Sequence, residues 1–122
     1  MQRPLKILVI RFSSIGDIVL ATPVIRCLKL QLNADIDFLT KKKYKEILIS
    51  NTNLSNIFSI SENAYEIIEI LRHQEYDFVI DLQNNFRSLR IRLALRVKSF
   101  ALLKNTFKRY LLIYFRINLL ND

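Results

Sequence analysis

The chain has 122 residues, of which 51% are hydrophobic and 25% charged, with a formal net charge of +8 at pH 7. This length suits a single domain, and the composition is that of a folded rather than a disordered chain. No apolar stretch approaches the roughly 18 to 20 residues that span a bilayer, so we expect no integral membrane protein. One cysteine and one histidine argue against a disulfide framework, a zinc centre or a Ser-His-Asp triad. We expect a cytoplasmic protein.

The positive charge is concentrated in the last third of the chain. Residues 1–85 hold ten Lys/Arg and ten Asp/Glu, whereas residues 86–122 hold nine Lys/Arg and one acid, which accounts for the net +8. Such a distribution favours an anionic partner, which could be nucleic acid, phospholipid head groups or a phosphorylated substrate. An ordinary solvated face remains the alternative.

The first half of the chain alternates short apolar runs with helical periodicity. Residues 6–11 form a short apolar run rich in β-branched residues, typical of a buried strand. Residues 17–32 repeat apolar side chains every three or four positions, which predicts a helix. Pro23 after Thr22 suits a first helical turn capped by Thr22, so this helix starts late or kinks there. A second strand is predicted over residues 35–39.

The same alternation continues to the end of the chain. Asn63 and Glu66 form a helix-capping pattern, and residues 77–82 are the clearest strand. The remaining predicted elements are a helix with Tyr44, Ile47 and Leu48 on its apolar face, a strand over 57–60, a helix marked by Phe86, Leu89 and Leu93, a strand over 97–103 and an apolar helix over 106–120. Alternating strands and helices predict an α/β, Rossmann-like fold whose parallel sheet carries helices on both faces.

Ligands of open parallel sheets bind beyond the carboxyl ends of the strands. The loops at that edge are predicted to be 12–17, 40–43, 61–63 and 83–87. The first contains Gly16, the only glycine in the chain. A chain that avoids glycine elsewhere is expected to need an unusual backbone angle or a close ligand approach at this turn. The loop is neither a dinucleotide fingerprint nor a P-loop, because it lacks the further glycines and the Gly-Lys-Ser/Thr sequence.

Asp17 follows this glycine and has two interpretations. It is either a helix N-cap that satisfies free backbone amides or a general base at the floor of a cleft. A helix N-terminus stabilises the carboxylate and weakens it as a base. A weak base still serves when the proton of the nucleophile leaves late in the reaction.

Two segments of the chain stand out, KILVIRFSSIGDIVLATPVIR at residues 6–26 and YDFVIDLQNNFRS at residues 76–88. Together they resemble the family 9 glycosyltransferases, the lipopolysaccharide heptosyltransferases. The resemblance implies the N-terminal half of a GT-B fold. It also implies inverting, metal-independent transfer of a heptose from an ADP-linked donor to the inner core of lipopolysaccharide, without a further cofactor. The base of that family falls on Asp17.

Members of this family carry a second domain of similar size that holds the nucleotide sugar. Residues 1–122 are therefore expected to be the single acceptor-side domain, truncated before a C-terminal domain and inactive alone. Phosphates and sugars of the acceptor are expected to contact polar residues of the loops and of the helix after residue 85. These predicted substrate-binding residues are Ser13, Ser14, Gly16, Lys41, Lys43, Asn84, Arg87 and Arg90.

Structural explanations compete with several of these assignments. The lysines and arginines could be ordinary surface charge, and Asn84 could simply form a turn. Asp81 is expected to accept hydrogen bonds from the amides of the loop 83–85 rather than to act in catalysis.

Three further hypotheses stay open. Residues 108–117 could lie in an anionic membrane interface, which would give peripheral contact with the inner membrane, although burial explains their apolar character better. A non-enzymatic basic module that binds nucleic acid or an anionic membrane surface is the alternative to the enzyme. No recognition helix or aromatic stacking platform supports nucleic acid as a partner. An inactive remnant is a third possibility.

Overall fold

A computed structural model describes residues 3–60 and 64–101. The predicted helix over 106–120, the loop 61–63 and the predicted cap Asn63 lie outside the described residues. The described elements, in chain order, are β1 (Lys6–Ile10), α1 (Ile15–Leu20), α2 (Thr22–Leu32), β2 (Asp35–Lys41), the 3-10 turn η1 (Lys42–Tyr44), α3 (Lys45–Leu48), β3 (Asn56–Ile60), α4 (Ala64–His73), β4 (Phe78–Asp81), α5 (Phe86–Leu95) and β5 (Lys98–Ala101).

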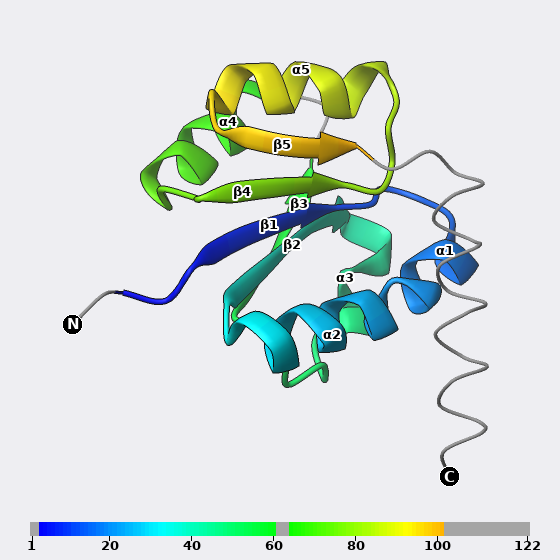
Figure 1. Ribbon diagram of the computed structural model, residues 1–122. Helices are drawn as coiled ribbons and strands as arrows, with labels where there is room; N and C mark the ends of the chain where they lie inside the picture. The colour runs from blue at the N-terminus through cyan, green and yellow to red at the C-terminus, as the bar shows by residue number, and fades with distance from the viewer. Residues whose placement is uncertain (1–2, 61–63, 102–122) are drawn as a thin grey trace, which may run out of the picture.

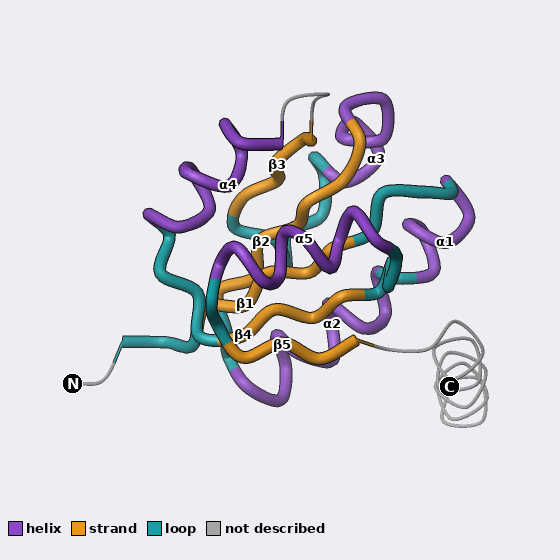
Figure 2. Tube along the Cα trace, turned by 90° about the horizontal axis from the view of Figure 1, so that it is seen from above, coloured by secondary structure: helices purple, strands orange, loops and turns teal. Residues whose placement is uncertain are grey.

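All five described strands form one parallel sheet in the order β3-β2-β1-β4-β5. Figure 1 shows the strands pointing in one direction, with α4 and α5 on one side of the sheet and α2 and α3 on the other. In Figure 2, which looks down on the first side, α5 crosses over the strands. The prediction of an α/β, Rossmann-like fold is confirmed. The strand order reverses between β1 and β4, where ligands of such folds bind.

β1 is apolar throughout because both of its faces are buried. Ile7 and Val9 belong to the core cluster that packs under α1, α2 and α3. Leu8 and Ile10 belong to the cluster under α4 and α5. All four side chains are fully or almost fully buried, and each contributes about 1.5–3 kcal/mol relative to exposure. The central strand therefore fixes the position of the loop that follows it.

The predicted helix over residues 17–32 is two helices. α1 begins earlier than predicted, at Ile15, and Ala21 separates it from α2. Pro23 occupies the first turn of α2, where its missing N–H is tolerated. Ala21 rather than Thr22 is the N-cap of α2, and the Thr22 hydroxyl instead donates to the Val19 carbonyl at 2.7 Å. The predicted break is confirmed, and the predicted cap is wrong by one residue.

The apolar residues that predicted α5 from the sequence, Phe86, Leu89 and Leu93, do not form its buried face. Ser88, Ile91 and Leu95 face the sheet, whereas Phe86 and Leu93 are exposed. The start of the helix decides this phase. Asn85 caps it by accepting a hydrogen bond from the Ser88 amide at 2.9 Å, and this turns Ser88 and the residues one and two turns later inward.

A polar cluster on the α4 side of the sheet joins β2, β3 and the segment that precedes β4. Asp37 of β2 accepts a hydrogen bond from the Tyr76 hydroxyl at 2.6 Å and from the Asn56 amide at 3.1 Å. Burial raises the pKa of Tyr76, as do its hydrogen bond to Asp37 and the charge of that residue. The phenol therefore stays protonated and serves as a donor, which pairs a carboxylate that the core would otherwise isolate.

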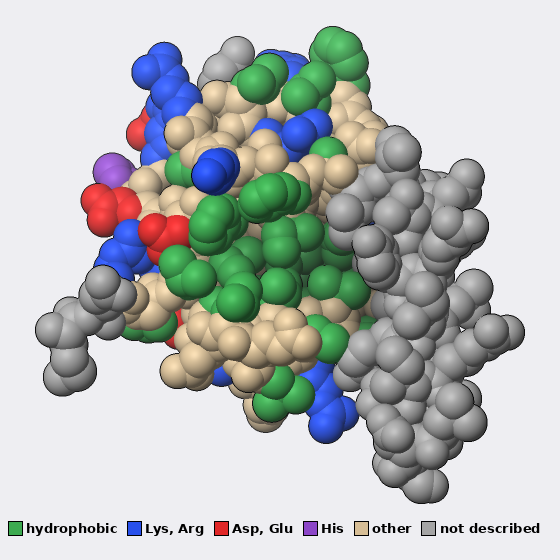
Figure 3. Space-filling model, viewed as in Figure 1, with side chains coloured by type: hydrophobic (Ala, Val, Ile, Leu, Met, Phe, Trp, Pro, Cys, Tyr) green, Lys and Arg blue, Asp and Glu red, His purple; other side chains and the backbone are tan. Residues whose placement is uncertain are grey.

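On the α2 side of the sheet, helices cover β4 and β5 less than they do on the α5 side. Figure 3 shows hydrophobic side chains gathered over this part of the sheet, between α5 and α2. The rings of Phe78 and Phe100 lie 6.0 Å apart there, and Phe100 is exposed. Within residues 3–60 and 64–101, no helix covers this edge on that side.

Candidate active site

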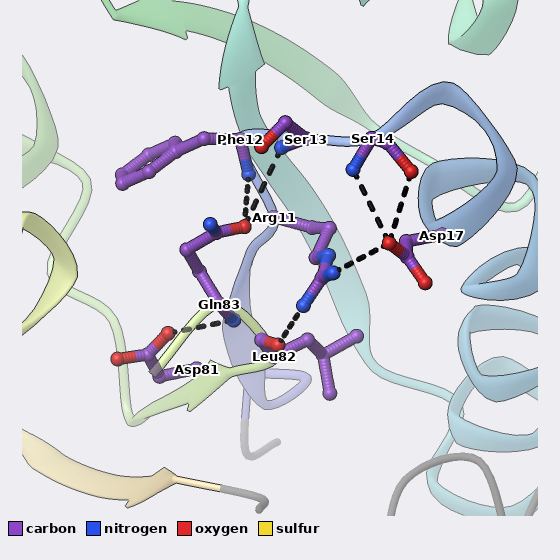
Figure 4. A network of polar contacts seen from close by, with 8 residues as sticks. All are labelled: Arg11, Phe12, Ser13, Ser14, Asp17, Asp81, Leu82 and Gln83. Carbon is purple, nitrogen blue, oxygen red and sulfur yellow. Dashed lines mark hydrogen bonds and ion pairs between the residues drawn. The ribbon is translucent and has the colours of Figure 1, made fainter. Parts of the chain in front are cut away.

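The carboxyl ends of β1 and β4 bring the two sequence motifs together. The Gln83 side-chain oxygen accepts hydrogen bonds from the backbone amides of Phe12, at 3.1 Å, and Ser13, at 3.4 Å. The Leu82 amide donates to the Ile10 carbonyl at 3.0 Å. Figure 4 shows the Gln83 contacts that join the loop after β1 to the loop after β4. The two loops therefore form one structural unit at the reversal point of the sheet.

Asp17 lies in the first turn of α1 at this edge. Its Oδ2 atom accepts hydrogen bonds from the Ser14 amide at 3.3 Å and the Ser14 hydroxyl at 3.0 Å. The same oxygen lies 2.8 Å from Nη2 of Arg11. In Figure 4 the other carboxylate oxygen points away from Arg11 and Ser14. One oxygen thus anchors the side chain, which is 17% exposed, and the other is directed elsewhere.

The N-cap interpretation of Asp17 needs correction. Ser14 is the N-cap of α1, and Asp17 is the third residue of the helix. Its carboxylate reaches back to the cap amide, as in a capping box. The helix begins before Gly16 rather than after it, so the carboxylate satisfies one backbone amide and keeps an oxygen for other contacts.

The pKa of Asp17 reflects two opposed influences. Burial works to raise it, but the hydrogen bonds from Ser14 and the charge and hydrogen bond of Arg11 outweigh burial. The net result is a pKa below the ordinary value of an aspartate. Asp17 is therefore ionised at neutral pH and is a weak base.

Arg11 is a site residue that the sequence reasoning missed. Its side chain is buried at the end of β1, and Nη1 donates to the Leu82 carbonyl while Nη2 contacts Asp17. A charged residue at the end of a fully apolar strand was the available signal, because burial of arginine requires partners. Arg11 therefore links Leu82, just after β4, to the Asp17 carboxylate on α1.

Gly16 does not need its conformational freedom. It lies inside α1, and no glycine in the described part of the chain has a positive φ. A Cβ atom at this position would meet nothing within 4 Å. The expectation of an unusual backbone angle at Gly16 is therefore wrong, because the helix has already begun at Ile15. Close approach of a ligand remains a prediction, and the open space around Gly16 is compatible with it.

Asp81 has the structural role that the sequence predicted. Its Oδ1 atom accepts hydrogen bonds from the amides of Gln83, at 3.0 Å, and Asn84, at 2.8 Å. Its Oδ2 atom lies 2.9 Å from Nε of Arg92 on α5. The carboxylate is fully buried, so it shapes the loop and does not face a ligand.

The other predicted site residues lie at different distances from this centre. Lys41 ends β2, the neighbour of β1, and Lys43 lies in the turn η1 that follows, so both stand at the same edge of the sheet. The Arg87 guanidinium lies 5.6 Å from the centre of the Phe12 ring, beside the turn. Asn84 is exposed with φ of 48°, which makes it a turn residue. Arg90 is exposed one helical turn further along α5.

No group of three or more His, Cys, Asp or Glu side chains comes together within the described ranges. No helix in those ranges is long and apolar enough to cross a membrane. A metal-independent reaction stays a prediction. The groups that the site offers are one ionised carboxylate, hydroxyls, amides and nearby cations.

Comparison with solved structures places this fold in a class. The chain has a glycosyltransferase-like fold: it is similar to the glycosyl transferase family 9 structure from Veillonella parvula, with a TM-score of 0.73 and 17% identity, over 83% of this chain and 33% of that one. No protein-family model matches the sequence, nor does any curated protein.

Within that class, the similarity extends to two heptosyltransferases of E. coli. The ADP-heptose lipopolysaccharide heptosyltransferase II matches with a TM-score of 0.72 and 23% identity over 80% of this chain and 30% of that one. Heptosyltransferase WaaC, solved with ADP, matches with a TM-score of 0.61 and 16% identity over 80% and 35%. The chain thus spans about a third of the length of the structures that it resembles.

Proposed function

We propose that this chain is the acceptor-side half of an inverting glycosyltransferase that moves a heptose from an ADP-linked donor to the inner core of lipopolysaccharide. The observation that carries the proposal is the placement of Asp17. Its carboxylate is anchored at the carboxyl edge of the sheet, where the strand order reverses, with one oxygen pointing away from the anchor. The likeness in fold to heptosyltransferases supports the choice of substrates.

In the proposed reaction Asp17 is the general base. An acceptor hydroxyl attacks the anomeric carbon of the heptose from the face opposite the leaving group, and a new C–O bond forms. The bond between that carbon and the diphosphate oxygen breaks, and ADP leaves with the electron pair. The proton of the hydroxyl passes to the Asp17 carboxylate. Attack from the opposite face inverts the configuration, and no metal or further cofactor takes part in these steps.

The lowered pKa of Asp17 is compatible with this role. A hydroxyl becomes acidic only as its oxygen forms the new bond, so the proton leaves late and a weak base suffices. Arg11 acts as a positioning residue, because it holds the Oδ2 atom and leaves the other oxygen for the acceptor. Ser13, Ser14 and the open face of Gly16 are proposed to contact the acceptor sugar.

The basic residues at the same edge are proposed to bind acceptor phosphates. Arg87 lies beside Phe12 of the turn, Lys41 ends the neighbouring strand β2, and Lys43 lies in η1 just after it. An arginine offers a fixed fork for phosphate, whereas lysine offers a point charge. Asn84 would contact sugar hydroxyls, and Arg90 would act at longer range from the outer surface of α5.

The donor would bind polypeptide outside these 122 residues, which cover about a third of the similar structures. The chain alone is then expected to turn over little substrate, because holding donor and acceptor together supplies much of the rate. The proposed compartment is the cytoplasm, at the inner membrane surface where a lipid-linked acceptor is accessible.

The role of Asp17 is tested by measuring glycosyl transfer with a donor-binding domain present. Asp17→Asn is isosteric and removes the base, so kcat should fall by about 10²–10⁴ with little change in KM for the acceptor. The matched control is Asp35→Asn, at the amino edge of β2, which should keep the wild-type rate. A near-normal rate for Asp17→Asn removes this residue from the mechanism.

Acceptor binding tests the assignment of this half without any donor. Titration of a phosphorylated inner-core oligosaccharide into the 122-residue chain should shift amide resonances of the loops 12–17 and 83–87. Arg87→Gln should weaken binding by about ten-fold, which is the loss of one charge-assisted contact. Shifts confined to the amino edge of the sheet contradict the proposed site.

A further inference from the structure

α5 carries large apolar side chains on its solvent side. Phe86 is 79% exposed and Leu93 is 67% exposed, and the half-buried Leu89 and the exposed Arg90 lie between them. These four residues are spaced at i, i+3, i+4 and i+7, which places them on one face of the helix. We call them the α5 outer face. Single exposed apolar residues are ordinary, whereas an aligned pair of this size on one helix is not.

The charge of α5 is equally one-sided. From Phe86 to its C-cap Arg96 the helix has four arginines and no acid. Arg92 turns inward to Asp81, and Arg87 lies beside Phe12, so Arg90 and Arg96 are the exposed cations. Figure 3 shows hydrophobic and basic side chains next to each other along the α5 side of the molecule.

The neighbouring helix α4 provides a comparison. Its exposed side chains include Glu66, Glu69, Ile70 and Arg72, and Arg72 is paired with Glu69 at 3.2 Å. This mixture of both charges is typical of a solvated helix. Among the helices within residues 3–60 and 64–101, α5 alone combines exposed Phe and Leu with exposed arginines that have no acidic neighbour on the helix.

We propose that the α5 outer face docks on the surface of an anionic lipid bilayer. An aromatic and a leucine side chain enter the boundary between head groups and acyl chains, and the arginines contact lipid phosphates. Both parts of the face match this partner, whereas a nucleic acid would match only the arginines. A leucine gains little from a nucleic acid, and one phenylalanine per two helical turns is not a stacking platform.

Docking of α5 would also orient the candidate active site. Phe86 directly follows the loop 83–85, and Arg87 contacts the ring of Phe12 in the other loop. In Figure 1 this end of α5 and helix α1 lie at the same edge of the sheet. A bilayer under the α5 outer face therefore lies beside the carboxyl edge. The inference does not require the transfer reaction, but it places a membrane-borne phosphorylated acceptor next to Asp17.

The test is sedimentation of the 122-residue chain with vesicles, which needs neither donor nor acceptor. The chain should bind vesicles of phosphatidylglycerol and phosphatidylcholine and should bind pure phosphatidylcholine much less. Phe86→Ser with Leu93→Ser should weaken binding to the anionic vesicles by ten-fold or more, since each fully inserted apolar side chain contributes roughly that factor. Arg90→Gln should weaken it by about five-fold.

The control is Leu30→Ser with Ile49→Ser. These residues are 72% and 63% exposed but lie on α2 and after α3, on the opposite side of the sheet, so binding should stay at the wild-type level. Circular dichroism confirms that each variant is folded. Equal binding of the α5 double variant and the wild type overturns the proposal, as does an equal loss in the control. Binding to RNA in place of vesicles also overturns it, and a failed glycosyl transfer assay leaves it standing.

Discussion

Arginine–aspartate pairs lie at both edges of the sheet, and Arg3–Asp77 and Arg11–Asp17 differ in their surroundings. At the amino edge Arg3 lies 3.0 Å from Asp77, with side chains 55% and 29% exposed. At the carboxyl edge Arg11 lies 2.8 Å from Asp17, with side chains 6% and 17% exposed. Asp77 also accepts a hydrogen bond from the Lys6 amide at 2.9 Å, so it fastens the chain entering β1 to the chain entering β4.

This difference separates a pair that water screens from a pair that water hardly reaches. The exposed pair is screened by water, and its ion pair contributes little beyond the backbone contact. In the buried pair water no longer stabilises either charge, so each side chain depends on the other for its electrostatic stabilisation. Residues of the second motif divide in the same way, because Tyr76 and Asp77 hold the core and the amino edge, whereas Asp81 and Gln83 shape the carboxyl edge.

The largest expected effect is that of removing the buried arginine. Arg11→Met keeps most of the apolar stem but leaves the Asp17 charge and the Leu82 carbonyl without this donor, which should lower the free energy of unfolding by about 3 kcal/mol. Arg3→Met should lower it by less than about 1 kcal/mol. Urea denaturation of both variants measures the difference. Equal losses would show that burial does not distinguish the two pairs.

The buried cluster near the amino edge should show an intermediate effect. Tyr76→Phe removes the 2.6 Å hydrogen bond to Asp37 and should cost about 1–3 kcal/mol of unfolding free energy, because a buried carboxylate loses a donor. Tyr44→Phe, at a half-buried ring, is the control and should change stability by less than about 0.5 kcal/mol. A Tyr76→Phe variant as stable as this control contradicts a structural role for the cluster.

The pH dependence of stability should report the pair at Asp17. Its pKa is lower in the folded chain than the ordinary value of 3.8, so the folded state binds the proton less well than the unfolded state. The stabilisation is therefore complete above the unfolded pKa and disappears as pH falls through the folded pKa. Unfolding of wild type and Asp17→Asn should differ most at neutral pH and converge in acid. A gap that widens in acid would reverse the sign of the shift.

The smallest expected effect concerns Gly16. Gly16→Ala meets no steric obstacle and should raise the free energy of unfolding by about 0.5–1 kcal/mol, because glycine is unfavourable inside a helix. If an acceptor approaches the backbone here, the same variant should bind the acceptor less tightly while being more stable. Thermal unfolding and acceptor titration of one sample give both values. Unchanged acceptor affinity would remove Gly16 from the binding site.

Much of the fold could be predicted because the sequence is locally consistent. The apolar run of β1, the alternation of strands with helices and the break at Pro23 all indicated the observed elements. The turn-holding role of Asp81 was also predictable, because an aspartate at the end of a strand before an Asn-rich loop readily accepts local amide hydrogen bonds.

The errors occurred where the chain had two locally acceptable solutions. α5 has apolar residues on two faces, and the capping pair Asn85 and Ser88 decides which of them meets the sheet. Gly16 looked like a hinge because it is the only glycine, but Ser14 begins the helix before it. Arg11 was missed because its place at the end of an apolar strand indicates burial but does not identify the partners, Leu82 and Asp17, that make the burial possible.

By itself the sequence determined the class of fold, the order of its elements and the two motifs that flank the reversal point of the sheet, because these depend on local periodicity and on short-range hydrogen bonding. Only the tertiary structure decided that Arg11 is buried against Asp17 and Leu82, and that Phe86 and Leu93 share an exposed face with Arg90. The physical reason is that the burial of Arg11 depends on Leu82, about seventy residues further along the chain, and the parallel pairing of β1 with β4 brings the two together.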